Sequence, residues 1–291
     1  MKKFLLIFLV FAFTEAYSQP PEGITPSQAD ALCASFWEGY DFRDLTPLQS
    51  PKVILDYIYL LSHLDHGTAS AHVSELMRRA SDDKKVFRQF LFLFERYLYD
   101  SRSRFENEAL YETVVRYAVN SHVLDSLEKY LPQFQLDMIA LNRPGTLVTD
   151  MEIGFADGSV RMLRQVEGEY VLLVFSNPEC KLCAELVGKI EASTLISDLH
   201  AEGRLCKLSV YPGNDLSAWN PSRFPCGWIA GYDKEDRIWS ERLFSLKTMP
   251  ALYLLDKDKK VLAKESSLDA VLLLLSQENM HRTAKEVEFR P

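Results

Sequence analysis

Two cysteines separated by two residues stand where an apolar strand pattern gives way to a helical one. Residues 170–175 form a short run rich in β-branched and aromatic side chains, which predicts a strand buried on both faces. Apolar residues then recur at helical spacing at Leu186, Val187 and Ile190. Cys180 is therefore expected at or near the N-terminus of a helix, with Cys183 one turn further on.

This placement favours thiol chemistry. The free N–H groups and the dipole at a helix N-terminus stabilise an anion, and thiols in such settings have pKa values of roughly 3.5 to 7.5. Cys180 is the expected attacking sulfur. Two intervening residues bring Cys183 close enough to close a disulfide and to resolve a mixed disulfide by intramolecular attack.

Other uses of two such cysteines are half of a zinc site, or two unrelated buried thiols. A zinc site needs two more ligands, whereas Cys33, Cys206 and Cys226 are isolated and form no second Cys-x-x-Cys. Cys33 and Cys206 fall in apolar patterns that favour buried, inert thiols. A structural disulfide between Cys206 and Cys226 stays open as the less favoured alternative.

A second pattern lies 66 residues beyond Cys183. Met249 and Pro250 precede an apolar run at 251–255, a charged turn at 256–260 and a returning strand at 261–263. A proline at the entrance of a strand is a candidate for a cis peptide bond. The alternative is a trans proline that starts an edge strand.

Together the dithiol and the Met249-Pro250 segment resemble the thioredoxin-like superfamily. That resemblance implies an α/β domain over residues 143–291, in which the Pro250 loop packs beside the dithiol and the backbone of Met249 receives the substrate chain. Residues 143–146 and 157–162 look like the N-terminal hairpin of the extracytoplasmic TlpA/ResA type. The residues that the resemblance implies for the site are Cys180 and Cys183 as catalytic groups and Met249 and Pro250 as substrate-binding groups.

The sequence departs from that family at three positions. Residues 177–179 stand where a tryptophan normally precedes the first cysteine, and Val174 occupies the position of a buried acid. Leu186 replaces the glutamate of the ResA type. Glu179 and Glu185 are candidate bases, but a solvated helix face is the favoured assignment for both.

Residues 25–141 predict a domain built of helices. Thr25 and Gln28 form a capping-box signature around Pro26, and Ser50 and Pro51 open a second helix. Further helices are expected at 71–79, 84–99, 107–120 and 123–141, followed by a linker at 142–145. Phrases at 36–42, 97–101 and 107–111 resemble an uncharacterised helical domain found ahead of thioredoxin-like domains in secreted proteins. The expected fold is an all-α N-terminal domain followed by a thioredoxin-like α/β domain.

Four side chains that can bind metals lie within one stretch of ten residues in this half: His63, Asp65, His66 and His72. A metal site is one interpretation of them. The favoured interpretation places His63 and His66 beside a helix end at Gly67, where an imidazolium is favourable. The sequence therefore predicts no metal and no other cofactor.

Residues 1–18 have the regions of a secretory signal peptide: Lys2 and Lys3, ten apolar residues at 4–13, and a cleavage site expected after Ser18. Ten apolar residues are too few to cross a bilayer. No later stretch is long and apolar enough, so no membrane span is expected after cleavage. The mature chain should reside in the periplasm or be otherwise secreted.

The formal net charge of −8 disfavours binding to nucleic acid or to anionic membranes. The leading hypothesis is an extracytoplasmic thiol-disulfide oxidoreductase that works as a reductant. Its expected partners are a protein disulfide client and a membrane electron donor, with client selection or donor docking assigned to the helical domain. The alternative is a binding or scaffold protein with a closed structural disulfide.

Overall fold

The computed structural model describes residues 23–217 and 219–288, so the predicted signal peptide at 1–18 lies outside the described residues. The chain divides into two compact units, one ending at Gln89 and the other beginning at Phe90. The domain boundary predicted at 142–145 falls inside the second unit and stays a prediction.

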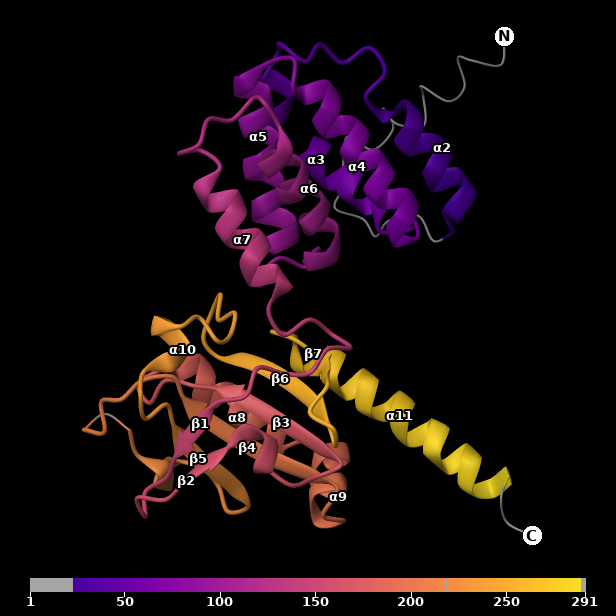
Figure 1. Ribbon diagram of the computed structural model, residues 1–291. Helices are drawn as coiled ribbons and strands as arrows, with labels where there is room; N and C mark the ends of the chain where they lie inside the picture. Colours follow the sequence, from indigo (N-terminus) through magenta and orange to yellow (C-terminus); the bar gives the residue numbers. More distant parts are fainter. Residues whose placement is uncertain (1–22, 218, 289–291) are drawn as a thin grey trace. The chain divides into compact units, whose positions relative to one another are not determined.

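In the described part of the first unit, residues 23–89, all the regular elements are helical. They are α2 (Pro26–Phe36), the 3-10 turn η1 (Thr46–Gln49), α3 (Pro51–Leu61), α4 (His66–Ala80) and the start of α5 (Lys84–Phe94), as Figure 1 shows. The predicted capping box is confirmed, because the Thr25 side chain accepts from the Gln28 N–H while the Gln28 side chain accepts from the Thr25 N–H. Ser50 caps α3 as expected.

Helix α4 begins five residues earlier than the sequence pattern indicates. The Asp65 carboxylate accepts the Thr68 N–H at 3.1 Å and caps the helix. Gly67 therefore lies in the first turn of α4, and the prediction of a helix end there is wrong. The three histidines have different partners: Nδ1 of His63 lies 2.9 Å from the Tyr59 carbonyl oxygen, Nε2 of His66 lies 3.5 Å from the Ser70 hydroxyl, and Nε2 of His72 lies 2.7 Å from Asp30.

The second unit starts with further helical elements. These are the rest of α5, a π-helical turn η2 (Glu95–Tyr99), α6 (Glu108–Asn120) and α7 (Tyr130–Ala140). The helix expected over 123–141 begins only at Tyr130. The physical reason is that Asp125 accepts the backbone N–H groups of Leu127 and Glu128 at 3.0 Å each, which holds this segment in a turn.

A seven-stranded mixed sheet follows, with the order β2-β1-β5-β4-β3-β6-β7. The strands are β1 (Glu152–Gly154), β2 (Val160–Met162), β3 (Tyr170–Phe175), β4 (Leu205–Tyr211), β5 (Trp228–Tyr232), β6 (Ala251–Asp256) and β7 (Val261–Ala263). The helices among and after them are α8 (Lys181–Glu191), α9 (Thr194–Ala201), α10 (Arg237–Ser240) and α11 (Leu268–Glu288), with 3-10 turns η3 (Leu163–Gln165) and η4 (Pro221–Arg223). The strands predicted at 170–175, 251–255 and 261–263 are all confirmed, and so is the fold class.

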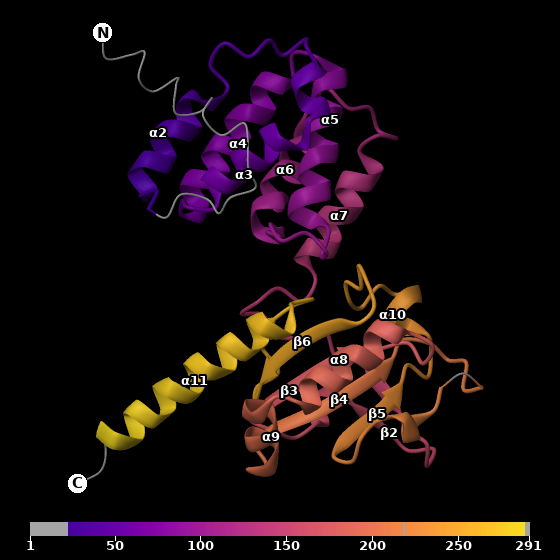
Figure 2. The same cartoon turned by 180° about the vertical axis from the view of Figure 1, so that it is seen from behind.

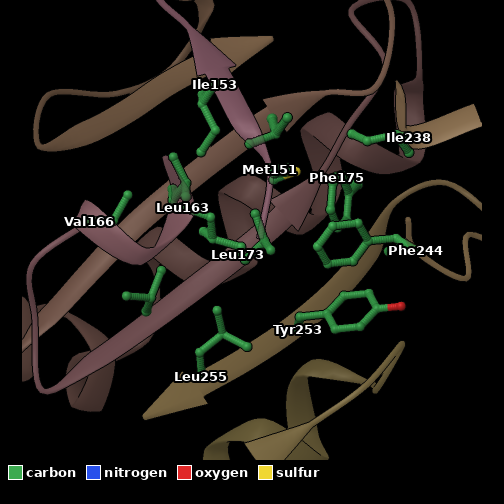
Figure 3. Packing of buried hydrophobic residues seen from close by; sticks show 14 of the residues in the cluster. Met151, Ile153, Leu163, Val166, Leu173, Phe175, Ile238, Phe244, Tyr253 and Leu255 are labelled. Carbon is green, nitrogen blue, oxygen red and sulfur yellow. The ribbon is translucent and has the colours of Figure 1, made fainter. Parts of the chain in front are cut away.

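The sheet separates two apolar layers. Leu172 and Val174 of β3 face a layer that includes residues of α8, α9 and α11, and Figure 2 shows α8 and α9 on the same face. Leu173 and Phe175 face the opposite layer, which Figure 3 shows with Phe244 and Tyr253. Because β3 is buried on both faces, its carboxyl end holds the following loop at a fixed place.

We expect Leu173→Ala to lower the free energy of unfolding by about 2–5 kcal/mol, because the lost side chain leaves a cavity in a fully buried layer. Urea unfolding followed by circular dichroism measures this. Leu273→Ala is the control, since Leu273 is 60% exposed and its loss should change the free energy by less than about 0.5 kcal/mol. Equal effects of the two substitutions would contradict the assignment of this layer as core.

Candidate active site

The loop between β3 and α8 holds Cys180 at the N-cap of α8, as the sequence predicts. The Asn177 side chain accepts the Glu179 N–H at 3.1 Å, and the Asn177 carbonyl accepts the Cys180 N–H at 3.0 Å. The Arg223 guanidinium donates another hydrogen bond to this loop, to the Pro178 carbonyl at 2.6 Å. These bonds hold the loop in a tight turn, which places Cys180 at the N-terminus of α8.

Cys180 and Cys183 form a disulfide, with their Cα atoms 5.2 Å apart. The backbone N–H of Cys183 points at the Cys180 sulfur, at 3.1 Å from nitrogen to sulfur. The two cysteines differ in access, because Cys183 is 3% exposed whereas Cys180 is only half-buried. The intervening Lys181 and Leu182 are exposed. An incoming sulfur therefore reaches Cys180 more readily than Cys183.

The second predicted segment lies against the first. The Met249–Pro250 peptide bond is cis, which confirms that expectation. Strand β6 pairs antiparallel with β3, with Ala251 opposite Phe175, so the residues just before β6 lie beside the loop that follows β3. The Met249 carbonyl oxygen lies 3.8 Å from the Cys180 sulfur. The structure thus brings Cys180, Cys183, Met249 and Pro250 together, while their roles in binding or catalysis stay predictions.

None of the positions that the sequence suggests for proton transfer holds a buried acid. Val174 is fully buried in the apolar layer under α8, at the position where the resembled family has an acid. Glu179 and Glu185 are exposed, which confirms the solvated assignment, and Glu185 lies 3.8 Å from the Lys181 ammonium. Leu186 packs against the apolar layer.

Sequence reasoning missed an ion pair between the buried Lys207 and the partly exposed Glu191 at the end of α8. The Lys207 ammonium is 2.7 Å from Glu191, and the Trp228 indole N–H donates to the same carboxylate oxygen at 2.9 Å. Burial alone raises the pKa of Glu191, but the bonds from Lys207 and Trp228 hold it below its ordinary value. A lysine inside a strand pattern is the only local signal for this pair.

The other three cysteines are free. A structural disulfide between Cys206 and Cys226 is therefore not formed. Burial raises the pKa of Cys33 to about 12 and that of Cys206 to about 11. Cys226 is exposed. Cys33 is buried, as its apolar pattern predicts, whereas Cys206 is only partly buried. That both thiols are inert stays a prediction.

Within residues 23–217 and 219–288, no group of three or more His, Cys, Asp or Glu side chains is arranged to hold a metal ion. In the same described part of the chain, no helix has the length and apolar character needed to cross a membrane.

Comparison with known proteins adds a family assignment. Residues 19–142 match the domain of unknown function DUF5106. No curated protein matches the chain. A solved structure of a thioredoxin-like protein from Bacteroides caccae is 32% identical, with a TM-score of 0.83, over 91% of this chain and 98% of that one. The C-terminal domain of an uncharacterised protein from Bacteroides fragilis is 38% identical over 46% of this chain and 98% of its own, with a TM-score of 0.45.

The match to the Bacteroides caccae protein extends over both the helical residues and the sheet. Its sequence identity, taken with the dithiol at the start of α8 and the cis-proline before β6, places the sequence in a family. The chain belongs to the thioredoxin-like proteins.

Proposed function

We propose that the chain is an extracytoplasmic thiol-disulfide oxidoreductase of the TlpA/ResA type, which uses Cys180 and Cys183 to reduce protein disulfides. One observation carries the proposal: a dithiol pair caps α8 with its first sulfur accessible, its second sulfur buried, and the Met249 carbonyl beside the first. This asymmetry is what an attacking and a resolving thiol require.

In the reductive direction, the Cys180 thiolate attacks one sulfur of a client disulfide. A Cys180–client disulfide forms, and the other client sulfur leaves as a thiolate that takes up a proton. The Cys183 thiol then loses its proton and attacks the Cys180 sulfur, which expels the second client sulfur. Two electrons pass from the Cys180/Cys183 dithiol to the client, and the Cys180–Cys183 disulfide remains for a membrane dithiol donor to reduce.

The position of Cys180 supports its role as the attacking group. As the N-cap of α8, its sulfur faces the N–H of Cys183 and the positive end of the helix dipole, both of which stabilise a thiolate. Met249 and Pro250 are assigned to hold the client chain beside that sulfur.

Location and partners belong to the same proposal. The signal-peptide pattern at 1–18 supports an extracytoplasmic location, where a protein disulfide is the available client. The residues matched by DUF5106 are assigned to client selection or to docking of the electron donor.

A second candidate function is a non-catalytic binding or scaffold protein with a permanently closed disulfide. The observation that favours it is the fully buried Val174, since the resembled family has a proton-accepting acid there. The two functions differ in whether the disulfide opens at physiological potentials.

The first test equilibrates the mature protein in defined glutathione or dithiothreitol buffers, followed by thiol alkylation and mass spectrometry. We expect reversible titration of the Cys180–Cys183 disulfide with a reduction potential above about −300 mV, because structural disulfides typically lie below that value. Cys180→Ser/Cys183→Ser is the control and should show no titration. A disulfide that stays closed across these buffers would support the scaffold function.

A second test separates the roles of the two sulfurs. Cys183→Ser should accumulate a mixed disulfide with a model client through Cys180, since the accessible thiol attacks but nothing resolves the product. Cys180→Ser should trap at least tenfold less, because Cys183 is buried. Non-reducing electrophoresis after acid quenching measures both. Equal trapping by the two variants would reject the assigned order of attack.

A third test concerns the free cysteines. At pH 8 with the disulfide closed, iodoacetamide should modify Cys226 at least tenfold faster than Cys206 or Cys33. With a pKa of about 11, only about one in a thousand Cys206 thiols is ionised at this pH. Peptide mass spectrometry over time gives the three rates, and similar rates would show that Cys206 and Cys33 are not shielded.

A further inference from the structure

Five charged side chains gather in the second unit between the helical residues after Phe90 and the loop that carries Met249. They are called the Lys247 cluster here and consist of Glu106, Glu108, Lys247, Lys264 and Glu265. No sequence pattern indicated them.

Lys247 lies at the centre of the cluster. Its ammonium is 2.9 Å from Glu106, 3.2 Å from Glu108 and 3.7 Å from Glu265. It also sits 4.4 Å from the ring centroid of Tyr99, at the end of η2. Two of its three carboxylate partners, as well as Tyr99, thus come from the segment 99–108.

Lys264, the residue that follows β7, contacts the same segment. Its ammonium is 3.0 Å from the second oxygen of Glu108 and donates to the carbonyls of Met138 and Ile139 at 3.0 and 3.2 Å. These carbonyls belong to the last turn of α7, where backbone acceptors lack partners within the helix. Glu108, in the first turn of α6, is therefore shared by both lysines.

The cluster is buried enough for each contact to matter. The side chains of Lys264, Glu265 and Lys247 are 2%, 4% and 11% exposed. Burial alone lowers the pKa of Lys247, but the carboxylates of Glu108 and Glu265 raise it above its ordinary value, so the ammonium stays charged. Removing one member of such a group leaves the others buried without their partner.

The same residues fix the backbone ahead of Met249. Glu265 accepts the Lys247 N–H at 2.6 Å with one oxygen and the Ser245 hydroxyl at 2.7 Å with the other. The Tyr253 hydroxyl donates to the Ser245 carbonyl at 2.7 Å. Hydrogen bonds to the Ser245 hydroxyl, the Ser245 carbonyl and the Lys247 N–H thus hold residues 245–247 in place.

Thr248 adds another contact, because its hydroxyl lies 3.0 Å from that of Ser101 in the turn after η2. The next residue is Met249, whose carbonyl oxygen lies 3.8 Å from the Cys180 sulfur. The negative end of a carbonyl dipole near sulfur disfavours the thiolate. The position of this oxygen therefore influences how stable the reduced pair is relative to the disulfide.

We propose that Lys247 is a positioning residue for the redox pair: through Glu106, Glu108 and Glu265 it holds the Met249 carbonyl against Cys180, so that the segment 99–108 sets the reduction potential of the dithiol. This inference rests on the proposed redox function of Cys180 and Cys183. It assigns the segment 99–108 a chemical effect on the site in addition to any role in binding partners.

The test measures the equilibrium between the full-length mature protein and a glutathione buffer for wild type and Lys247→Met. With the loop released, the Met249 carbonyl moves away from the sulfur and the thiolate becomes more stable. We expect the equilibrium to move toward the dithiol by about tenfold, which corresponds to about 30 mV. Circular dichroism and thermal unfolding establish that the variant is folded.

Lys207→Met is the matched control. Lys207 is also a buried lysine, 5% exposed and paired with a glutamate at 2.7 Å, but its partners Glu191 and Trp228 lie outside residues 245–249. It should lose stability without changing the reduction potential. An equal shift in both variants would show a general effect of lost stability and overturn the proposal.

Glu106→Gln provides a milder second variant, which carries the test if Lys247→Met does not fold. Glu106 is partly exposed and contacts Lys247 from the loop before α6. We expect a shift in the same direction of about two- to threefold. Potentials equal to that of wild type, or shifts toward the disulfide, overturn the positioning role while leaving the redox function intact. A wild-type pair that does not titrate overturns both.

Discussion

Strand β3 is buried on both faces and paired on both edges, and the two halves of the candidate site depend on this. Its parallel partner β4 and antiparallel partner β6 leave no freedom in register. Cys180 lies in the loop that follows β3, and Pro250 directly precedes β6, so both residues lie at the same end of the sheet. The dithiol and the cis-proline, about 70 residues apart in the sequence, thus meet because two neighbouring strands run in opposite directions.

The parts of this architecture with local signals could be predicted from the sequence. The apolar runs of β3 and β6, the capping box at Thr25 and the helix after Cys180 each depend on residues within one or two turns. The helical pattern that starts at residue 123 does not show that the Asp125 side chain holds the next residues in a turn, so the start of α7 could not be predicted from it. Asp65 has a sequence position typical of an N-cap, and the structure shows that it caps α4.

The charged side chains in the interior have no such local signal in the sequence. Lys247 meets Glu106 and Glu108 across about 140 residues of sequence, and Lys207 of β4 meets Glu191 of α8 across 16 residues that include α9. Charged residues in isolation indicate a solvated surface, and only the tertiary structure shows which of them are buried with a partner. The sequence pointed to Cys180, Cys183, Met249 and Pro250, but the groups that hold the Met249 loop carry no sequence pattern of their own.

The Lys247 cluster also affects where the chain can be divided. The match to DUF5106 ends at residue 142, yet the second compact unit already begins at Phe90. A fragment cut at 142 keeps Lys247, Lys264 and Glu265 but loses Glu106 and Glu108, so three side chains that are buried in the whole chain would face water. Hydration would satisfy those charges, and the sheet could still form. Such a fragment would keep the thioredoxin-like fold while lacking the contacts that Lys247 and Thr248 make with Tyr99, Ser101, Glu106 and Glu108. The sequence-family boundary is therefore a poor guide to the smallest part of the chain in which the segment before Met249 keeps all its contacts.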